Sequence, residues 1–368
     1  MEQRTMGVEE ELILVDPETR VAAPRAEQVL RYAAESGGDG GDPAEELDHE
    51  LFAHQLETRT PPVTDAGALR AHLVRLRRRA ARAAEQAGVL TAASGAVPLP
   101  GGPPRTTRDD RYLAMVETYG EVARPGGTCG QHVHVAIEDD ESGIRAIDAI
   151  TPWLPVLLAI SANSPYYHGR DTHYASWRSQ AWAQWPSAGP TEAFGSATAY
   201  HALSRQLVAS GAAMDPGMLY FDARLSAHQP TLEVRIADVC TDPDDATLLA
   251  VLVRALVCSE LDGGGLTTGT WRAELLRAAR WRAARYGLTD RLLDPPSGAL
   301  APARAVLERL LDHTRVQLEV SGDLDLVRAA LPRVLAAGGA SRQRAAYERS
   351  GASLPAVVDD LVRRTNAP

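Results

Sequence analysis

The chain has 368 residues, of which 45% are hydrophobic and 23% are charged, proportions that are typical of a globular enzyme. Its formal net charge of −10 argues against a general surface for nucleic acid or for an anionic membrane. No apolar run approaches the roughly 20 residues that cross a bilayer, so we expect no membrane-spanning helix. Cys129, Cys240 and Cys258 lie far apart without a CxxC spacing, which disfavours a disulfide framework or a zinc knuckle. Because no signal-peptide core follows Met1, we expect a cytoplasmic enzyme.

The sequence contains no lysine, so all 38 of its basic residues are arginine. A lysine is required by the phosphate-binding loop GxxxxGK[ST], by protein kinases and by enzymes that hold pyridoxal phosphate as a Schiff base. These three function classes are therefore excluded. Any fixed positive charge that meets a phosphate group in this protein must come from arginine or from a metal ion.

The N-terminal part of the chain predicts one strand and two helices. Residues 6–15 predict a strand, residues 25–36 a helix that ends at two glycines, and residues 37–44 a flexible loop. Asp65 is expected to cap a second helix, over residues 65–86. We interpret the arginine-rich stretch of this helix as a solvated face rather than an anion site; it comprises Arg75, Arg77, Arg78, Arg79 and Arg82.

The rest of the chain predicts further strands, followed by a helical C-terminal third. Strands are expected at 89–95, 128–138, 218–224 and 231–237. A mostly apolar helix is expected at 144–162, and a long functional loop at 164–195. Because strands and helices do not alternate regularly, an α+β fold with a mainly antiparallel sheet is predicted. We expect one catalytic domain over residues 1–368, with a sheet-bearing part to about 245 and a helical part from about 246.

The first strand carries two acids on one face. Strand alternation places Val8 and Leu12 on one side, and Glu9 and Glu11 together on the other. Two neighbouring carboxylates repel each other unless a cation lies between them, and magnesium prefers such hard oxygen ligands. A solvent-facing strand edge explains the same pattern without a metal.

A second strand carries His132 and His134 on one face, within the segment GQHVHV. Two histidines spaced in this way are a familiar metal-binding arrangement, also found in metal-dependent hydrolases. Those hydrolases need further histidines and usually a lysine, which this chain does not offer at suitable positions. Two hydrogen-bonded histidines in a polar core are the alternative.

Two further pairs of charged residues complete the set. Glu233 and Arg235 share a strand face, where the glutamate can complete a metal shell and the arginine can grip a carboxylate or phosphate. A plain ion pair is the alternative. Glu50 and Glu57 flank the segment LFAHQL and can add two carboxylates, although their spacing leaves their relative orientation open. Together these strands present what a multi-metal phosphoryl-transfer site requires.

The chain resembles the carboxylate–amine ligases of the glutamate–cysteine ligase type 2 family. The matching segments span nearly the whole chain in family order: GVEEELILVDP (7–17), ELFAHQLETRT (50–60), GQHVHV (130–135), ISANSPYYHGRDTHYASWR (160–178), TLEVRIADVCTDP (231–243) and RAARYGL (282–288). The resemblance implies a glutamine-synthetase-like fold. In that fold the concave face of a curved antiparallel sheet holds ATP, metals and amino-acid substrate, and helices pack on the convex side.

The resemblance also implies roles for individual residues. The expected metal ligands are Glu9, Glu11, Glu50, Glu57, His132 and Glu233. Arg235 is expected to contact phosphate or a substrate carboxylate, and Arg178 to bind substrate or phosphate, while Gln131 and His134 are weaker candidates beside the cluster. Glu10 departs from the family, which usually has an apolar residue there. Because alternation turns Glu10 toward the core, it needs a partner or a place near the strand edge.

The reaction that the resemblance implies has two steps and uses magnesium-bound ATP. The γ-phosphoryl group moves to a substrate carboxylate, and an amine then attacks the acyl phosphate and releases phosphate. Glutamate is the expected acid, and cysteine or another amino acid the expected amine, so the partners are small molecules. A ligase with a different acid or amine, a metal-dependent hydrolase and a catalytically silent relative remain open alternatives. A homodimer is suggested by relatives.

Overall fold

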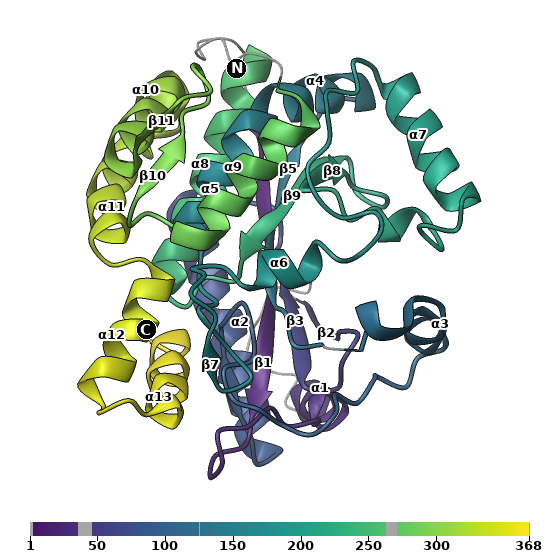
Figure 1. Cartoon of the computed structure of the whole chain (residues 1–368), viewed down its shortest axis with the longest axis vertical. Coiled ribbons are helices and arrows are strands. Elements are labelled where there is room, and N and C mark those ends of the chain that lie inside the picture. The colour runs from purple at the N-terminus through teal and green to yellow at the C-terminus, as the bar shows by residue number, and fades with distance from the viewer. Residues whose placement is uncertain (1–2, 36–45, 125, 263–270, 368) are drawn as a thin grey trace.

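The computed structural model describes residues 3–35, 46–124, 126–262 and 271–367 (Figure 1). Its main sheet has seven strands in the order β2-β3-β1-β5-β9-β8, with β4 paired to the end of β1. Every strand pair in this sheet is antiparallel, as predicted. The strands are β1 (Met6–Val15), β2 (Glu46–His49), β3 (Gln55–Arg59), β4 (Leu90–Ala92), β5 (Gly130–Ala136), β8 (Ala223–Leu225) and β9 (Thr231–Asp238).

The register of the sheet aligns the polar positions of neighbouring strands. Glu11 of β1 lies opposite Glu57 of β3, and Glu9 lies opposite His132 of β5. His134 in turn lies opposite Glu233 of β9. Because side chains alternate along each strand, these residues point to one face of the sheet.

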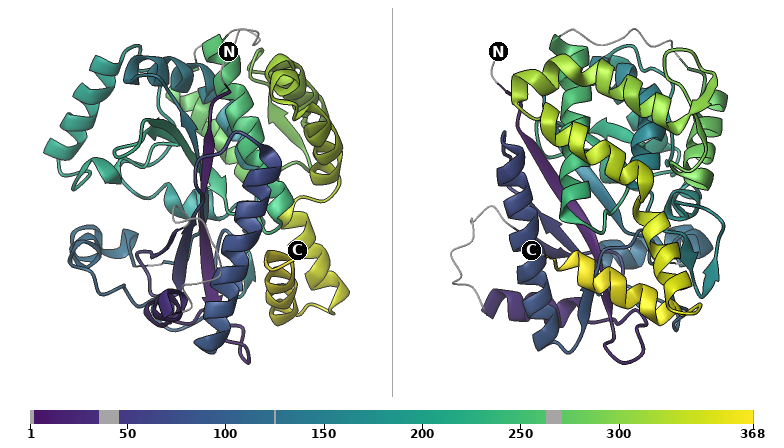
Figure 2. Two further views of the ribbon diagram at one scale, coloured as in Figure 1. Left: turned by 180° about the vertical axis from the view of Figure 1, so that it is seen from behind. Right: turned by 90° about the vertical axis from the view of Figure 1, so that its left-hand side faces the viewer.

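The opposite face of the sheet is covered by helices, and the apolar residues of the strands pack there. The covering helices are α2 (Ala66–Gln86), α4 (Asp140–Ile150), α5 (Leu154–Ser161) and α8 (Pro243–Asp262). Figure 2 shows α2 running along the length of the sheet from behind. Asp65 caps α2 as expected, since its side chain accepts a hydrogen bond from the backbone N–H of Ala68.

The interpretation of the α2 arginines as a solvated face is wrong for Arg77. Its side chain is buried and pairs with Glu10 of β1, with Nη2 and Nε at 2.6 and 2.9 Å from the two carboxylate oxygens. Arg77 also donates to the backbone carbonyls of Cys240 and Thr241. The core-facing Glu10 therefore has the partner that it requires. Helical periodicity was a usable signal here, because Arg77 lies four residues after Leu73 and three before Ala80, on the buried face of α2.

The stretch Asp140–Ser161 has the length and a mean hydropathy of 1.4 that a membrane-spanning helix would need, contrary to expectation. However, 83% of its most apolar window is buried inside the protein, as in the core helix of a globular fold. The single helix expected at 144–162 is divided by a 3₁₀ turn, Thr151–Trp153, that contains Pro152. A proline removes a backbone hydrogen bond and so interrupts the helix.

Other expected elements differ in extent. The strand expected at 218–224 is shorter and later in the structure: β8 covers Ala223–Leu225, and Met218 belongs to a 3₁₀ turn, Pro216–Met218. The expected loop at 164–195 contains a two-stranded hairpin and a short helix, and the loop expected at 37–44 lies outside the described residues. The elements outside the main sheet and its covering helices are α1 (Ala26–Glu35), α3 (Asp110–Tyr119), β6 (Tyr166–Tyr167), β7 (Arg170–Asp171), α6 (Arg178–Trp182) and α7 (Ala197–Ala209).

The C-terminal third is helical, as predicted, apart from one small hairpin (Figure 1). It contains α9 (Ala273–Tyr286), β10 (Arg291–Leu293), β11 (Leu300–Pro302), α10 (Ala303–Ser321), α11 (Leu324–Ala336), α12 (Gly339–Arg349) and α13 (Leu354–Thr365). The largest apolar cluster combines residues of the sheet with residues of α8, α9, α10 and α11. The final helix, α13, packs against β4.

Candidate active site

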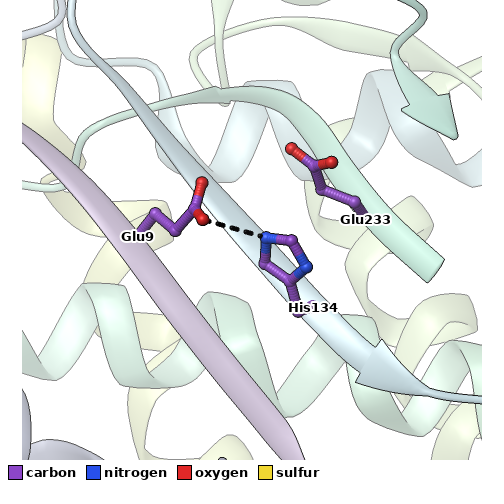
Figure 3. Close-up of side chains that lie close together, drawn as sticks. All are labelled: Glu9, His134 and Glu233. Atoms are coloured by element: carbon purple, nitrogen blue, oxygen red, sulfur yellow. Dashed lines mark ion pairs between the residues drawn. The ribbon is translucent and has the colours of Figure 1, made fainter. Parts of the chain in front are cut away.

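Glu9, His134 and Glu233 come together from three adjacent strands (Figure 3). One ligand atom of each lies within 4.8 Å of the others, a spacing that could hold a metal ion. Nε2 of His134 lies 3.4 Å from Oε1 of Glu9, and Nδ1 is 2.9 Å from the hydroxyl of Thr231. We call this set the histidine-containing donor group.

Glu11, Glu50 and Glu57 form a second set, with donor oxygens that also lie within 4.8 Å of one another. Glu11 and Glu57 are opposite each other on β1 and β3, and both are buried. Glu50 reaches the same place from the segment that follows β2. We call this set the carboxylate donor group. Its oxygen-only chemistry is what magnesium prefers.

His132 lies between the two donor groups. Its Nδ1 is 3.0 Å from Oε2 of Glu9, and its Nε2 is 3.7 Å from Oε1 of Glu11. Nδ1 is also 3.8 Å from Oε1 of Glu233. The ring is buried, so it links both groups within the protein interior.

The crowding of acids shifts their pKa values in opposite directions. Burial and the neighbouring Glu11 carboxylate raise the pKa of Glu50 to about 7. Burial, together with Glu9 and Glu50, raises the pKa of Glu57 well above its usual value. Burial opposes ionisation of Glu9 as well, but the hydrogen bond with His132 and the nearby His134 hold its pKa well below the ordinary range. The carboxylate donor group thus has more negative charge than its protein partners neutralise, which favours a cation there.

Arg235 supplies the positive charge beside the histidine-containing donor group. Its guanidinium forms an ion pair with Glu233 and lies over the ring of Tyr220, with 5.8 Å between Cζ and the ring centroid. Despite burial, Arg235 and Arg224 lower the pKa of Glu233, so this carboxylate is ionised. Burial and the nearby Arg235 also lower the pKa of His132, which favours the neutral ring and leaves one ring nitrogen available as a ligand.

A β-bulge brings Arg178 to the same region. The register between β5 and β9 shifts between Gln131 and Val133, so β9 has one extra residue there. Arg178, at the start of α6, donates to the carbonyls of Arg235 and Ile236 on the bulged strand, at 3.4 and 3.3 Å. A side chain at Gly130 would overlap the Arg178 guanidinium, so glycine is required for this approach.

The segment that carries Arg178 is fastened by Asp238, a buried residue at the end of β9. Its carboxylate accepts hydrogen bonds from the hydroxyls of Ser164 and Ser176, at 2.6 and 2.7 Å. The Ser164 hydroxyl also accepts the backbone N–H of Arg178 at 3.0 Å. Asp238 therefore positions Arg178 through the loop that precedes it.

Gln131 does not join the other candidate residues. It lies opposite Glu10 on the helix-covered face, and its side-chain amide donates to the carbonyl of Ala246 in α8. The remaining candidates share the site face. Sequence reasoning missed two arginines there, Arg59 and Arg224, which pair with Glu57 and Glu233. The same-face spacing of Glu57 and Arg59, identical to that of Glu233 and Arg235, was a usable signal.

An apolar cavity adjoins the carboxylate donor group. Glu11 and Glu50 line one side of it, and Phe52, Trp182 and Tyr220 are among the aromatic residues that line the rest. We call this the catalytic cavity. Its combination of acids at one end and flat apolar surfaces elsewhere suits a small organic substrate with a polar reacting group.

Comparisons with known proteins agree with this arrangement. The sequence model of "Glutamate-cysteine ligase family 2 (GCS2)" matches residues 5–363. A Nocardioides protein, named provisionally as glutamate–cysteine ligase 2-1, is 53% identical over 370 residues, covering 99% of this chain and 96% of its own. A Streptomyces coelicolor protein, named provisionally as glutamate–cysteine ligase 2, is 44% identical over 367 residues. The match covers 99% of this chain and 99% of the Streptomyces protein.

Solved structures share the fold. Glutamate–cysteine ligase from Francisella tularensis, in complex with AMP, matches with a TM-score of 0.74 and 10% identity, over 100% of this chain and 90% of its own. A bifunctional glutathione synthetase from Pasteurella multocida matches with a TM-score of 0.69 and 17% identity over 99% of this chain. This chain spans about half the length of the Pasteurella protein, 52%.

The fold, the acidic site and these relatives define an enzyme, an ATP-dependent ligase of the carboxylate–amine class. The chain belongs to glutamate–cysteine ligase family 2. The expected resemblance is thereby confirmed.

Proposed function

We propose that this enzyme activates the γ-carboxylate of glutamate with ATP and joins it to the amine of cysteine or of another amino acid. The observation that supports the proposal most directly is the pair of three-residue donor groups on one sheet face, with His132 between them. Such an arrangement suits the transfer of a phosphoryl group, whose negative charge must be neutralised on several oxygens at once.

Magnesium fits the residues of this site. The carboxylate donor group offers only oxygen atoms, and Glu9 and Glu233 add two more carboxylates beside His134. In this proposal the expected ligands Glu9, Glu11, Glu50, Glu57, His132 and Glu233 hold the ions. His134 contributes a nitrogen in place of its weaker expected role. Bound magnesium would neutralise phosphate charge and orient the phosphate chain.

Two arginines complete the charge pattern. Arg235 lies beside Glu233 and faces the site, so we assign it to the transferred phosphate or to the substrate carboxylate. Arg178 serves the same region, and its hydrogen bonds to the bulge carbonyls also fix the backbone of Arg235. No arrangement of side chains supplies a covalent nucleophile in this proposal, because the acyl phosphate already contains a good leaving group.

The proposed reaction has two steps, a phosphoryl transfer and the formation of an amide bond. In the first step the γ-carboxylate of glutamate attacks the γ-phosphorus of ATP, and ADP leaves. In the second step the amine attacks the carbonyl carbon of the acyl phosphate, inorganic phosphate leaves, and the amine loses a proton. The aromatic walls of the catalytic cavity would keep water from competing with the amine.

The proposal also includes the cellular compartment, the domain organisation and the oligomeric state of the enzyme. Cys129, Cys240 and Cys258 are buried and free, which suits a reducing cytoplasm. We propose one catalytic domain of the glutamine-synthetase type, with a curved sheet whose acids face ATP, and a homodimeric assembly. Size-exclusion chromatography with light scattering measures the assembly directly.

A screen for ADP release tests the reaction. The purified enzyme is incubated with ATP, magnesium, glutamate and a panel of amines, and products are identified by mass spectrometry. We expect ADP release that requires both glutamate and an amine, and a product with one new amide bond. Hydrolysis of an amide without ATP, together with no ADP release for any amine, would replace the ligase with a hydrolase.

A further inference from the structure

A second cavity lies beside the catalytic cavity, and none of the residues assigned to the reaction lines it. Its volume is about 190 Å³, and Gly126 lines both cavities, so the two adjoin. His54, His168 and Arg105 are its polar side chains, and no acidic residue is among its lining residues. We call it the histidine cavity. This absence of acids contrasts with the carboxylates of the catalytic cavity.

Two stacked ring pairs each contribute one ring to the lining of each cavity. Phe52 and His54 stack with centroids 5.7 Å apart, and Tyr167 and His168 stack with centroids 4.0 Å apart. In each pair the first ring lines the catalytic cavity and the histidine lines the histidine cavity.

His54 is the strongest sign that the histidine cavity binds a ligand. Its side chain is only 5% exposed, and its Nε2 has no hydrogen-bond partner among the described residues. A buried polar atom without a partner costs free energy, so such atoms need an explanation. Burial and the nearby His168 lower the pKa of His54 to about 4, so its imidazole is neutral near pH 7.

Glycine positions keep the cavity open and its wall rigid. Gly126 has φ of +48°, and a Cβ there would lie 2.8 Å from the Phe52 ring. Gly127 has φ of +80°, and a Cβ there would lie 2.5 Å from a methyl group of Val97. Both residues combine a left-handed backbone with no space for a side chain, which restricts these positions to glycine.

We propose that the histidine cavity binds a carboxylate of a small-molecule substrate, with His54, His168 and Arg105 as the recognising groups. An anion would give Nε2 of His54 the partner that it lacks, and Arg105 would add charge at the exposed side. Gly126 lines both cavities, so we place the reacting group of an amino-acid substrate at the acids and its other carboxylate at the histidines. This substrate assignment rests on the proposed ligase function, whereas the binding of a carboxylate does not.

Glutarate binding to the metal-free protein tests the proposal without ATP. EDTA removes any metal ion that could hold a carboxylate in the catalytic cavity, and binding in the histidine cavity is then detected on its own histidines. We expect glutarate to shift the imidazole NMR signals of His54 and His168, and glutaramide, which has the same shape without charge, to bind at least about tenfold more weakly.

Variants separate recognition from folding. We expect His54→Phe and His168→Ala each to weaken glutarate binding about tenfold or more by calorimetry, while the exposed His228→Ala leaves it unchanged. His54→Gln, which keeps a hydrogen-bonding group, should retain part of the binding. Equal affinity for glutarate and glutaramide, or unchanged glutarate affinity in His168→Ala, would overturn the proposal even if ADP release confirmed the ligase. Glutarate binding without any ADP release would instead leave this cavity in place and remove the ligase.

Discussion

Glu9 and His132 face each other across β1 and β5, with 3.0 Å between Oε2 of the acid and Nδ1 of the imidazole. This contact connects the two donor groups, because Glu9 belongs to the histidine-containing group and His132 also approaches Glu11. The site is therefore one continuous network rather than two separate clusters. A change at either end should affect both.

His132→Gln should show this connection. The substitution removes a ring that lies between the two donor groups. We therefore expect the magnesium affinity of each donor group to fall about 10- to 100-fold. Titration with manganese, followed by electron paramagnetic resonance, counts the ions and measures each affinity. The exposed His201→Gln is a matched control and should bind as the wild type. Loss of a single ion with the other unaffected would show that the two groups act independently.

The pair of Glu10 and Arg77 should dominate local stability on the helix-covered face. Both side chains are buried, and removal of one partner leaves the other charge without compensation. We expect Arg77→Met to lower the free energy of unfolding by about 3–5 kcal/mol. The double variant Glu10→Leu with Arg77→Met should recover much of that loss. Urea unfolding measures the free energy of unfolding of the single and the double variant, with the exposed Arg78→Met as control. A double variant that is no more stable than Arg77→Met would contradict this account.

Glu50 should make the stability of the metal-free protein depend on pH. Its pKa is about 7 in the folded protein and near 4.5 in the unfolded chain, so the folded state binds more protons between these values. Its contribution to stability is complete below pH 4.5 and is lost as the pH rises to about 7. We therefore expect the difference in melting temperature between the wild type and Glu50→Gln, measured in EDTA, to change against the wild type as the pH rises from 4.5 to about 7.

Magnesium should reverse that trend. Because the ion binds the ionised carboxylate, the increase in melting temperature on adding magnesium should grow as the pH rises toward 7 and then level off. Differential scanning fluorimetry at a series of pH values, with and without magnesium, measures both effects. A magnesium effect that is equal at pH 5 and pH 8 would exclude the carboxylate donor group as its origin.

Gly130→Ala should impair the reaction while the sheet remains intact. The new methyl group would overlap the Arg178 guanidinium and displace it from the bulge carbonyls. A displacement of about 1 Å can reduce a rate about 100-fold. We expect a loss of that order in the rate of ADP release, with an unchanged circular dichroism spectrum. Full activity would show that the position of Arg178 is not critical.

Much of the fold could be inferred from local patterns in the sequence. β1 has the predicted bounds, and α2 follows its cap Asp65 and ends at residue 86, as predicted. Local patterns specify such elements because alternation, capping and helix-ending glycines act over a few residues. The short β8 was harder, since residues 219–222 have the apolar composition of a strand but lie outside β8, and Phe221 forms only an isolated bridge with Gly189.

The site was predictable in its residues but not in its pairings. Alternation placed Glu9 with Glu11 and His132 with His134, yet the register that brings Glu9 opposite His132 depends on contacts between distant strands. The spacing of Glu50 and Glu57 left their orientation open, because the chain turns between β2 and β3. The partner of Glu10 and the unpartnered Nε2 of His54 depend on packing, which no local pattern contains.

Magnesium-dependent ADP release by Glu233→Gln tests the central claim most directly. Glu233 is buried in the histidine-containing donor group, and its amide variant keeps the shape but loses the charge that binds metal. With glutamate and the amine that the screen identifies, we predict release reduced at least about 100-fold, no change in circular dichroism, and wild-type release from the exposed control Glu308→Gln. Wild-type release by Glu233→Gln at the same magnesium concentration would contradict the account, because Glu233 would then have no part in holding the metal.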